Sequence, residues 1–309
     1  MNASLHRLPA QQVSAEFIES KLQFMADIHL WPERQQMDPD TWLENFRDAE
    51  RPYALNLLNV FMYFNEPLVD ALFRAAVRSL SAAITTPAMS LADAKARWRA
   101  FLARVRVTFV QGEHPRPTDS GIVFARKARQ VLDISDDQIV EPSLALKGLI
   151  EDPASPVLFV DDFVGGGSQM SATWRRQYSV GPGRSSSFEA AAQYNSFVVY
   201  TPLLATTHGL EILAQKCSGL RVCPAHSIDT RYSLTAPDSI LWPDSLRSSA
   251  VDVLFEASKR AGIVDEYEHG WQGFRDLALA VAFWHSVPDA TLPLFFWDRN
   301  GWAPLIRRI

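Results

Sequence analysis

The stretch PVLFVDDFVGGGSQM, residues 156–170, decides the predicted fold of this chain. Its first residues, 156–160, are apolar and rich in strand-forming side chains, so they predict a short buried strand. The adjacent carboxylates Asp161 and Asp162 stand at the carboxyl end of that strand. Three glycines follow and lead into a predicted helix that begins near Ser168. The order is therefore strand, acidic pair, glycine loop and helix.

This order of residues suits a sugar phosphate. Glycines allow backbone N–H groups to approach an anion closely, and a helix N-terminus adds positive potential. Adjacent carboxylates accept hydrogen bonds from two vicinal hydroxyls. We therefore expect Asp161 and Asp162 as candidate catalytic residues at a ribose. The candidate phosphate-binding residues are Gly165, Gly166, Gly167, Ser168 and Gln169. The alternative is a tight strand-to-helix turn with solvated aspartates.

The same pattern of strand, loop and helix occurs on either side of this stretch. The apolar run 105–110 is followed by the polar loop QGEHPRPTDSG, residues 111–121, and by a predicted helix over 122–132. The run FVVY, residues 197–200, precedes a predicted helix over 208–216. Alternating strands and helices indicate an α/β fold with a mainly parallel sheet and flanking helices. Ligands bind at the carboxyl ends of the strands in such sheets.

The two ends of the chain have a different pattern. Apolar residues at helical spacing predict an N-terminal helical region, residues 1–103. The α/β core is expected over 104–235. A C-terminal extension of helices and strands, 236–309, is expected to pack on that core. Within the extension we predict a helix over 273–284 and a strand in LPLFFWDR, residues 292–299.

Further candidate site residues lie in the other two loops. Ser120 and Gly121 precede a helix and are candidate N–H donors to an anion, with Arg126 on that helix. The alternatives are an N-cap role for Ser120 and a solvated Arg126. Asp119 is a candidate ligand for a Mg²⁺ ion that bridges a diphosphate. In the third loop, Thr207 and His208 are candidates to face the group on C1 of the ribose. His208 is then an acid or base, or it only caps or packs at the helix start.

Composition limits the classes of protein. The chain of 309 residues has a formal net charge of −5 and a sequence pI near 5.8, which argues against a strongly basic nucleic-acid-coating surface. Its two cysteines, Cys217 and Cys223, are expected to be reduced thiols. The longest apolar segment, 277–284, is too short for a membrane span, and the N-terminus lacks a secretory h-region. We expect a cytoplasmic protein with no membrane partner.

The sequence also resembles a known family. VLFVDDFVGGGS resembles the phosphoribosyl pyrophosphate motif of type I phosphoribosyltransferases. The resemblance implies that Asp161 and Asp162 contact ribose hydroxyls, and that Gly165–Gly167, Ser168 and Gln169 cradle the 5-phosphate. Gly166 and Gln169 stand where that family has threonines, so phosphate would depend more on backbone N–H groups and Ser168.

A narrower resemblance covers most of the chain. The segments are TWLENF, ALNLLNVFMYF, DSGIVFARKAR, FVDDFVGGGSQ, VVYTPLLATTHGLEIL, SVPDATLPLFFW and GWAPL. In this order they resemble phosphoribosyltransferase-like proteins of bacterial conflict systems, which are encoded beside reverse transcriptases in retrons and related loci. This implies an effector in antiphage defence. The implied partners are phosphoribosyl pyrophosphate or a nucleotide, Mg²⁺, a reverse transcriptase, its RNA or DNA product, and a winged-helix protein.

Three functions remain open at this point. The first is an enzyme that transfers or hydrolyses at ribose C1, as a phosphoribosyltransferase or an N-glycosidic hydrolase. The second is a catalytically inactive nucleotide sensor. The third is an interaction module that docks a reverse transcriptase or its nucleic acid.

Overall fold

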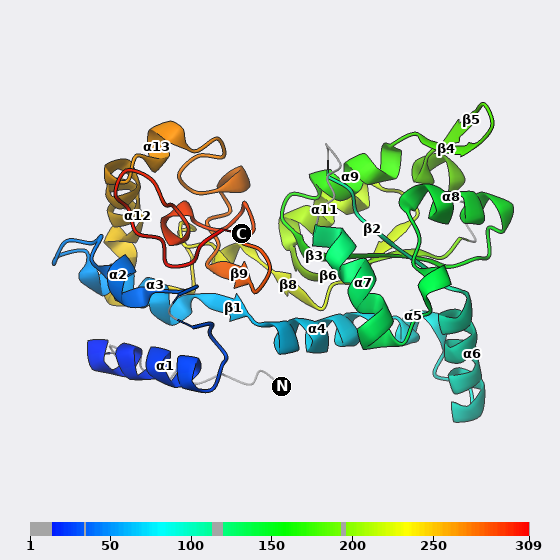
Figure 1. Cartoon of the computed structure of the whole chain (residues 1–309), viewed down its shortest axis with the longest axis horizontal. Helices are drawn as coiled ribbons and strands as arrows, with labels where there is room; N and C mark the ends of the chain where they lie inside the picture. The colour runs from blue at the N-terminus through cyan, green and yellow to red at the C-terminus, as the bar shows by residue number, and fades with distance from the viewer. Residues whose placement is uncertain (1–13, 34, 113–119, 193–195, 309) are drawn as a thin grey trace, which may run out of the picture. The chain divides into compact units, whose positions relative to one another are not determined.

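The computed structural model describes residues 14–33, 35–112, 120–192 and 196–308 (Figure 1). The chain divides into two compact units. One contains the residues up to Glu66 and from Thr230 onward, and we call it the terminal unit. The other, Pro67–Asp229, contains the large sheet, and we call it the sheet unit.

The sheet unit is built on a parallel sheet of five strands. These are β2 (Arg106–Phe109), β3 (Val157–Val164), β6 (Val198–Thr206), β7 (Leu220–Val222) and β8 (His226–Ile228). The strand order is β2-β3-β6-β7, and β8 also pairs with β6. Every one of these pairings is parallel. The expected α/β fold with a mainly parallel sheet is confirmed.

The two central strands, β3 and β6, are almost wholly buried. Parallel strands that are covered by helices on both faces consist of nearly continuous apolar residues. The first residues of β3, VLFV, and of β6, VVY, follow this rule. Pro202 is unusual inside a central strand because it has no N–H to donate. It lies where the neighbour of β6 changes from β7, paired with residues 198–200, to β8, paired with residues 204–206.

Helices cover this sheet. Those of the sheet unit are α4 (Glu66–Ser79), α5 (Ser81–Ile84), α6 (Leu91–Arg104), α7 (Ser120–Leu132), α8 (Pro142–Glu151), α9 (Ser168–Arg175), α10 (Phe188–Ala191) and α11 (Thr207–Lys216), with the 3₁₀ turn η1 (Asp136–Gln138) and the hairpin β4 (Tyr178–Gly181) and β5 (Arg184–Ser186). Helix α7 packs against β2 and β3 (Figure 1). One core joins Phe159, Trp174, Phe188 and Tyr200 from the sheet, α9 and α10.

The terminal unit combines both ends of the chain. Its elements are α1 (Ala15–Asp27), α2 (Pro39–Leu43), α3 (Arg51–Val60), β1 (Met62–Phe64), η2 (Thr230–Tyr232), α12 (Asp244–Arg260), α13 (Ile263–Glu266), η3 (Phe274–Asp276), β9 (Val281–Phe283) and η4 (Pro293–Phe295). One hydrophobic core contains residues from both ends. Within it Trp42 stacks on Phe295 and donates its indole N–H to the carbonyl of Leu294 at 2.7 Å.

This division differs from the boundaries predicted at residues 103 and 235. Residues 67–103 belong to the sheet unit, and the C-terminal part shares a core with the N-terminal helices. Helical periodicity shows that a segment has a buried face, but it does not show which element covers that face. The sequence pattern therefore grouped the helices by type and not by packing.

Two predicted elements of the C-terminal part are wrong. Over 273–284 the structure has η3 and then β9, because Arg275, Asp276 and Ala278 adopt positive φ and interrupt any helix. Strand β9 pairs in parallel with β1, a pairing that the local sequence does not reveal. The aromatic run at 292–299 contains the 3₁₀ turn η4 and not a strand. A short apolar run can form either a helical turn or a strand. Here the run packs against Trp42 through Phe295 as a helical turn.

Within the described residues, no helix combines the length and apolar composition that crossing a bilayer requires.

Candidate functional site

Three helices begin at the carboxyl edge of the sheet, where β2, β3 and β6 end. Helix α7 begins at Ser120, α9 at Ser168 and α11 at Thr207. The carboxyl ends of parallel strands meet at one edge, so the positive N-terminal ends of these helices lie on the same side of the sheet. A Cβ on Gly121 would lie 2.9 Å from the carbonyl oxygen of Val110, which shows how tightly α7 packs against the end of β2.

The acidic pair lies inside β3 and not just after it. The strand continues through the pair to Val164, and the two residues are only 2% and 6% exposed. The hydroxyl of Tyr200 donates to Oδ2 of Asp161 at 2.9 Å. The backbone N–H of Asp162 donates to Oδ1 of the same carboxylate at 3.0 Å. The structure thus brings the two aspartates together with a tyrosine from the neighbouring strand.

Burial changes the acidity of these groups. It is the main cause that raises the pKa of Asp161 well above its ordinary value, and the charge of Asp162 adds to the effect. The hydrogen bond from Tyr200 acts in the opposite direction, because it favours the ionised carboxylate. The pKa of Tyr200 is also raised well above its ordinary value, first by burial and then by the charge of Asp161. The phenol of Tyr200 is therefore uncharged at neutral pH, and its hydroxyl donates the hydrogen bond to Asp161.

The glycine loop is fixed from two sides. Gly167 has φ of +70° and is the N-cap of α9, a conformation that favours glycine. The hydroxyl of Ser171 donates to its carbonyl oxygen at 2.7 Å. From β6, the hydroxyl of Thr206 donates to the carbonyl oxygen of Gly165 at 2.5 Å. The loop shape is thus set by α9 and by the start of α11.

The third loop packs directly on the glycine loop. A Cβ on Gly209 would lie 2.4 Å from the carbonyl oxygen of Gly165, so the two backbones meet without room for a side chain. The N-cap of α11 is Thr206, whose side chain accepts from the N–H of Gly209 at 2.9 Å. The predicted residues Thr207 and His208 form the first turn of α11 and are half-buried.

The first loop is only partly described. The hydroxyl of Thr173 on α9 donates to the carbonyl oxygen of Gln111 at 2.9 Å and accepts from its N–H at 3.1 Å. Helix α9 therefore holds the beginning of the loop that follows β2. Asp119, the predicted magnesium ligand, lies outside the described residues. Arg126 is exposed on α7.

Sequence reasoning missed Tyr200, and it placed Thr206 and Gly209 in the third loop without foreseeing their contacts. A threonine before a helix start is a common N-cap signal, so the capping role of Thr206 was open to prediction. No local signal in the sequence points to Tyr200 or to the close backbone contact of Gly209. The contact between Tyr200 and Asp161 depends on the register of β3 against β6, in which Phe159 lies opposite Tyr200.

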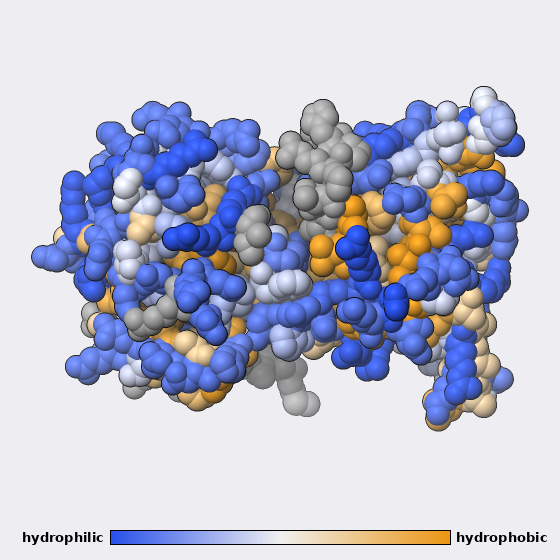
Figure 2. Space-filling view, viewed as in Figure 1, coloured by the Kyte–Doolittle hydropathy of each residue, from blue (hydrophilic) through white to orange (hydrophobic). Residues whose placement is uncertain are grey.

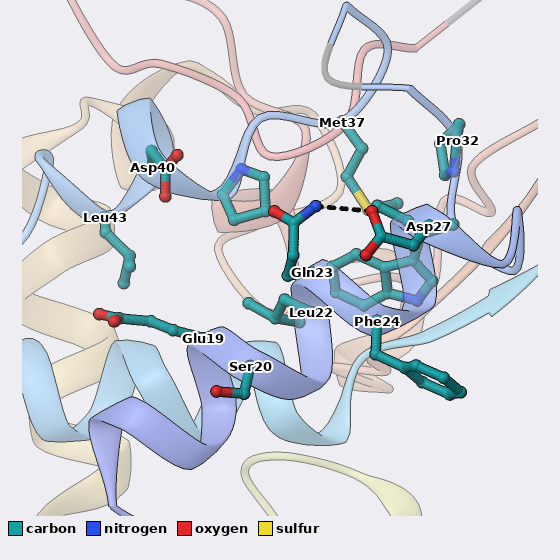
Figure 3. Close-up of a pocket in the computed structure, with 13 residues that line it drawn as sticks. Glu19, Ser20, Leu22, Gln23, Phe24, Asp27, Pro32, Met37, Asp40 and Leu43 are labelled. Carbon is teal, nitrogen blue, oxygen red and sulfur yellow. Dashed lines mark hydrogen bonds between the residues drawn. The ribbon is translucent and has the colours of Figure 1, made fainter.

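No three His, Cys, Asp or Glu side chains come close enough to hold a metal ion in the part of the chain that the structure describes. A separate cavity of about 560 Å³ lies in the terminal unit, around α1 and α2 (Figure 3). Its walls include the apolar residues Leu22, Trp31 and Met37, and Gln23 donates to Asp27 at 2.7 Å beside it. None of the predicted site residues lines it.

Comparison with known protein families finds a match that covers most of the chain. No curated protein matches this chain. No solved structure matches it either. The PRTase-CE family, which is phosphoribosyltransferase-like, matches residues 39–308, and these span both units. Because this match covers most of the sequence and agrees with the parallel sheet, the chain belongs to the PRTase-CE family.

Proposed function

We propose that this protein binds the ribose 5-phosphate part of phosphoribosyl pyrophosphate or of a nucleotide at the carboxyl edge of β3 and β6. One observation carries the proposal. The acidic pair lies in the last half of β3 and the glycine loop follows directly after this strand, at the edge where α7, α9 and α11 begin. Helix N-termini and exposed backbone N–H groups favour a phosphate.

In this proposal each part of the ligand has its own partner. Asp161 and Asp162 accept hydrogen bonds from the ribose hydroxyls. The 5-phosphate accepts hydrogen bonds from the N–H groups of Gly165–Gly167 and from Ser168. The half-buried His208 is the candidate to contact the group on C1. A transition state with positive charge at C1 then requires mainly positioning and charge stabilisation from the protein.

Magnesium would neutralise the diphosphate of such a ligand. Mg²⁺ is usually held by one or two carboxylates together with substrate phosphates, so in this proposal the ion enters with the diphosphate. Asp119 is the carboxylate that we propose beside it. The acceptor at C1 is a base, a nucleotide, a macromolecule or water, and water would make the protein destroy its own donor.

A nucleotide sensor without turnover is the second candidate function. The resemblance to type I phosphoribosyltransferases favours it, because Gly166 and Gln169 stand where that family has threonines. ³¹P NMR of phosphoribosyl pyrophosphate with the protein and Mg²⁺ distinguishes the two. Release of diphosphate or a new C1 product supports the enzyme, whereas an unchanged ligand with saturable binding supports the sensor.

We further propose that the protein acts as an effector of a retron-type antiphage system, by its resemblance to such proteins. An interaction role for the terminal unit fits three exposed apolar side chains, Phe17 and Phe24 of α1 and its C-cap residue Ile28. Figure 2 shows some apolar surface among the hydrophilic surface around α1. A co-purification of the protein with the reverse transcriptase of its own locus, with and without Phe17→Ser/Phe24→Ser, tests this part.

The decisive experiment is isothermal titration with phosphoribosyl pyrophosphate and Mg²⁺. We expect saturable binding by the wild type and its loss in Asp161→Asn/Asp162→Asn. The chain supplies a matched control in its second pair of adjacent aspartates, Asp136 and Asp137, which are exposed in η1. The variant Asp136→Asn/Asp137→Asn should bind as the wild type does. No binding by folded wild type, with phosphoribosyl pyrophosphate and with nucleotides, would refute the proposed function.

A further inference from the structure

Tyr200 lies beside the acidic pair on the neighbouring strand. It stands opposite Phe159 in the register of β6 against β3, and its side chain reaches two residues further along β3 to Asp161. Its residue surface is 1% exposed, so the phenol is inaccessible to bulk water. The bond between its hydroxyl and Oδ2 of Asp161 measures 2.9 Å.

A phenol in this position has a specific electrostatic effect. Burial and the neighbouring Asp162 side chain both oppose ionisation of Asp161. A donated hydrogen bond favours the carboxylate form, and bonds to ionised groups are stronger than those between neutral groups. In a buried site a donor of this kind therefore makes it easier for the pair to lose its proton.

Resting on the proposed function, we propose that Tyr200 is a positioning residue of the ribose site. Its hydroxyl holds the Asp161 carboxyl group in place and favours its ionised form, so that the pair accepts hydrogen bonds from sugar hydroxyls at neutral pH. Tyr200 acts through Asp161 and has no contact with the sugar in this proposal.

Other described side chains influence Asp161 or Tyr200 as well. Asp162 faces Asp161 from the same strand, and Tyr200 faces it from β6. Cys217, which follows α11, influences Tyr200. Burial raises the pKa of the Cys217 thiol, so it is uncharged at neutral pH. Among these side chains, the tyrosine is thus the one that favours ionisation of Asp161.

The first test needs no ligand. The carboxyl ¹³C signal of Asp161, assigned with Asp161→Asn, is titrated in the wild type and in Tyr200→Phe. We expect the midpoint of Asp161 to move upward in Tyr200→Phe, because the variant removes the donor and keeps the burial. Thr201→Val is the control, because it removes a buried hydroxyl from the next residue of β6, one that donates to the carbonyl oxygen of Phe159 at 3.3 Å. The titration midpoint of Asp161 in Thr201→Val should equal that in the wild type. An unchanged midpoint in folded Tyr200→Phe would overturn the proposal.

The second test measures affinity for phosphoribosyl pyrophosphate with Mg²⁺ between pH 6 and pH 9. Losing a hydrogen bond to an ionised group should weaken binding by Tyr200→Phe about tenfold at pH 7. The difference should shrink as the pH rises, because the pair ionises in both proteins. An equal loss at every pH would mean a merely structural role and would refute the proposal.

A double-mutant cycle separates the effect of Tyr200 on Asp161 from a general loss of folding in Tyr200→Phe. In the Asp161→Asn background, Tyr200→Phe should change affinity by less than about twofold, because the group on which Tyr200 acts is absent. A tenfold loss in that background would contradict the inference. Absence of ligand binding by the wild type would instead refute the proposed function, and the ligand-free titration would still report on Tyr200.

Discussion

The hydroxyl of Thr206 donates a hydrogen bond to the carbonyl oxygen of Gly165 at 2.5 Å, and so ties the end of β6 to the glycine loop. The same hydroxyl accepts from the N–H of Gly209 at 2.9 Å. The side chain of Thr206 therefore holds the loop proposed for phosphate and also caps α11, the helix that follows β6. The first two predictions concern this junction.

Replacing Thr206 by valine keeps the shape of the side chain and removes both hydrogen bonds. We expect a loss of about 1–2 kcal/mol in the free energy of unfolding, which is typical of a lost helix cap. Ligand affinity should fall as well, because the glycine loop loses its fixed position. Thr206→Ser keeps the hydroxyl and should retain most of both properties. Urea denaturation and isothermal titration provide the measurements, and equal behaviour of the two variants would argue against this role.

Gly209→Ala should disturb the site through its backbone. The new Cβ would lie 2.4 Å from the carbonyl oxygen of Gly165 and 2.8 Å from Cγ1 of Val164, so α11 or the glycine loop must shift. We expect weaker ligand binding and a destabilisation of about 1–3 kcal/mol, as overpacking usually causes. Gly181→Ala is the control, because a Cβ on Gly181 would meet nothing within 4 Å. Wild-type affinity in Gly209→Ala would contradict the tight packing.

The raised pKa of Asp161 makes stability depend on pH. Unfolding lets this group ionise at its ordinary pKa, so its contribution to stability is complete below that value. The contribution is lost as the pH rises towards the pKa of the folded protein. Asp161→Asn should therefore gain stability relative to the wild type as the pH increases through this window. Thermal melting at a series of pH values tests the prediction, with Asp136→Asn as control, and a difference that is constant with pH would contradict it.

A partly buried ion pair joins α4 to α7. Lys127 lies 2.7 Å from Asp70, with side chains 7% and 32% exposed. Asp70→Asn leaves a buried ammonium group with less compensation, so we expect a loss of about 2–4 kcal/mol in the free energy of unfolding. The exposed pair of Arg129 and Asp136, at 3.2 Å, serves as control. Asp136→Asn should change stability by about 1 kcal/mol or less. Equal effects of the two variants in urea denaturation would refute the assignment.

Local patterns predicted the part of the chain that carries the candidate site. The apolar run before Asp161, the three glycines and the helix start at Ser168 all lie where the sequence placed them. Such a segment is predictable because buried parallel strands are mostly apolar, and because consecutive glycines indicate a tight turn. One detail differed, since the strand continues past the acidic pair to Val164.

The C-terminal part was predicted less well for a physical reason. Strand β9 exists because β1 lies beside it, and β1 itself follows a helix whose apolar pattern continues into Phe64. Pairing between residues about 220 positions apart cannot be read from either segment alone, because both are short and apolar. The aromatic turn at Pro293–Phe295 depends in the same way on packing against Trp42.

The sequence by itself determined the α/β class, the position of the acidic pair and glycine loop, and the resemblance to phosphoribosyltransferase-like proteins, which the PRTase-CE match confirms. These follow from local propensities and from contiguous residues. Only the tertiary structure decided that both ends of the chain share one core, and that Tyr200 and Thr206 hold Asp161 and Gly165. Those contacts arise from strand register and helix packing, which bring together residues about 40 positions apart.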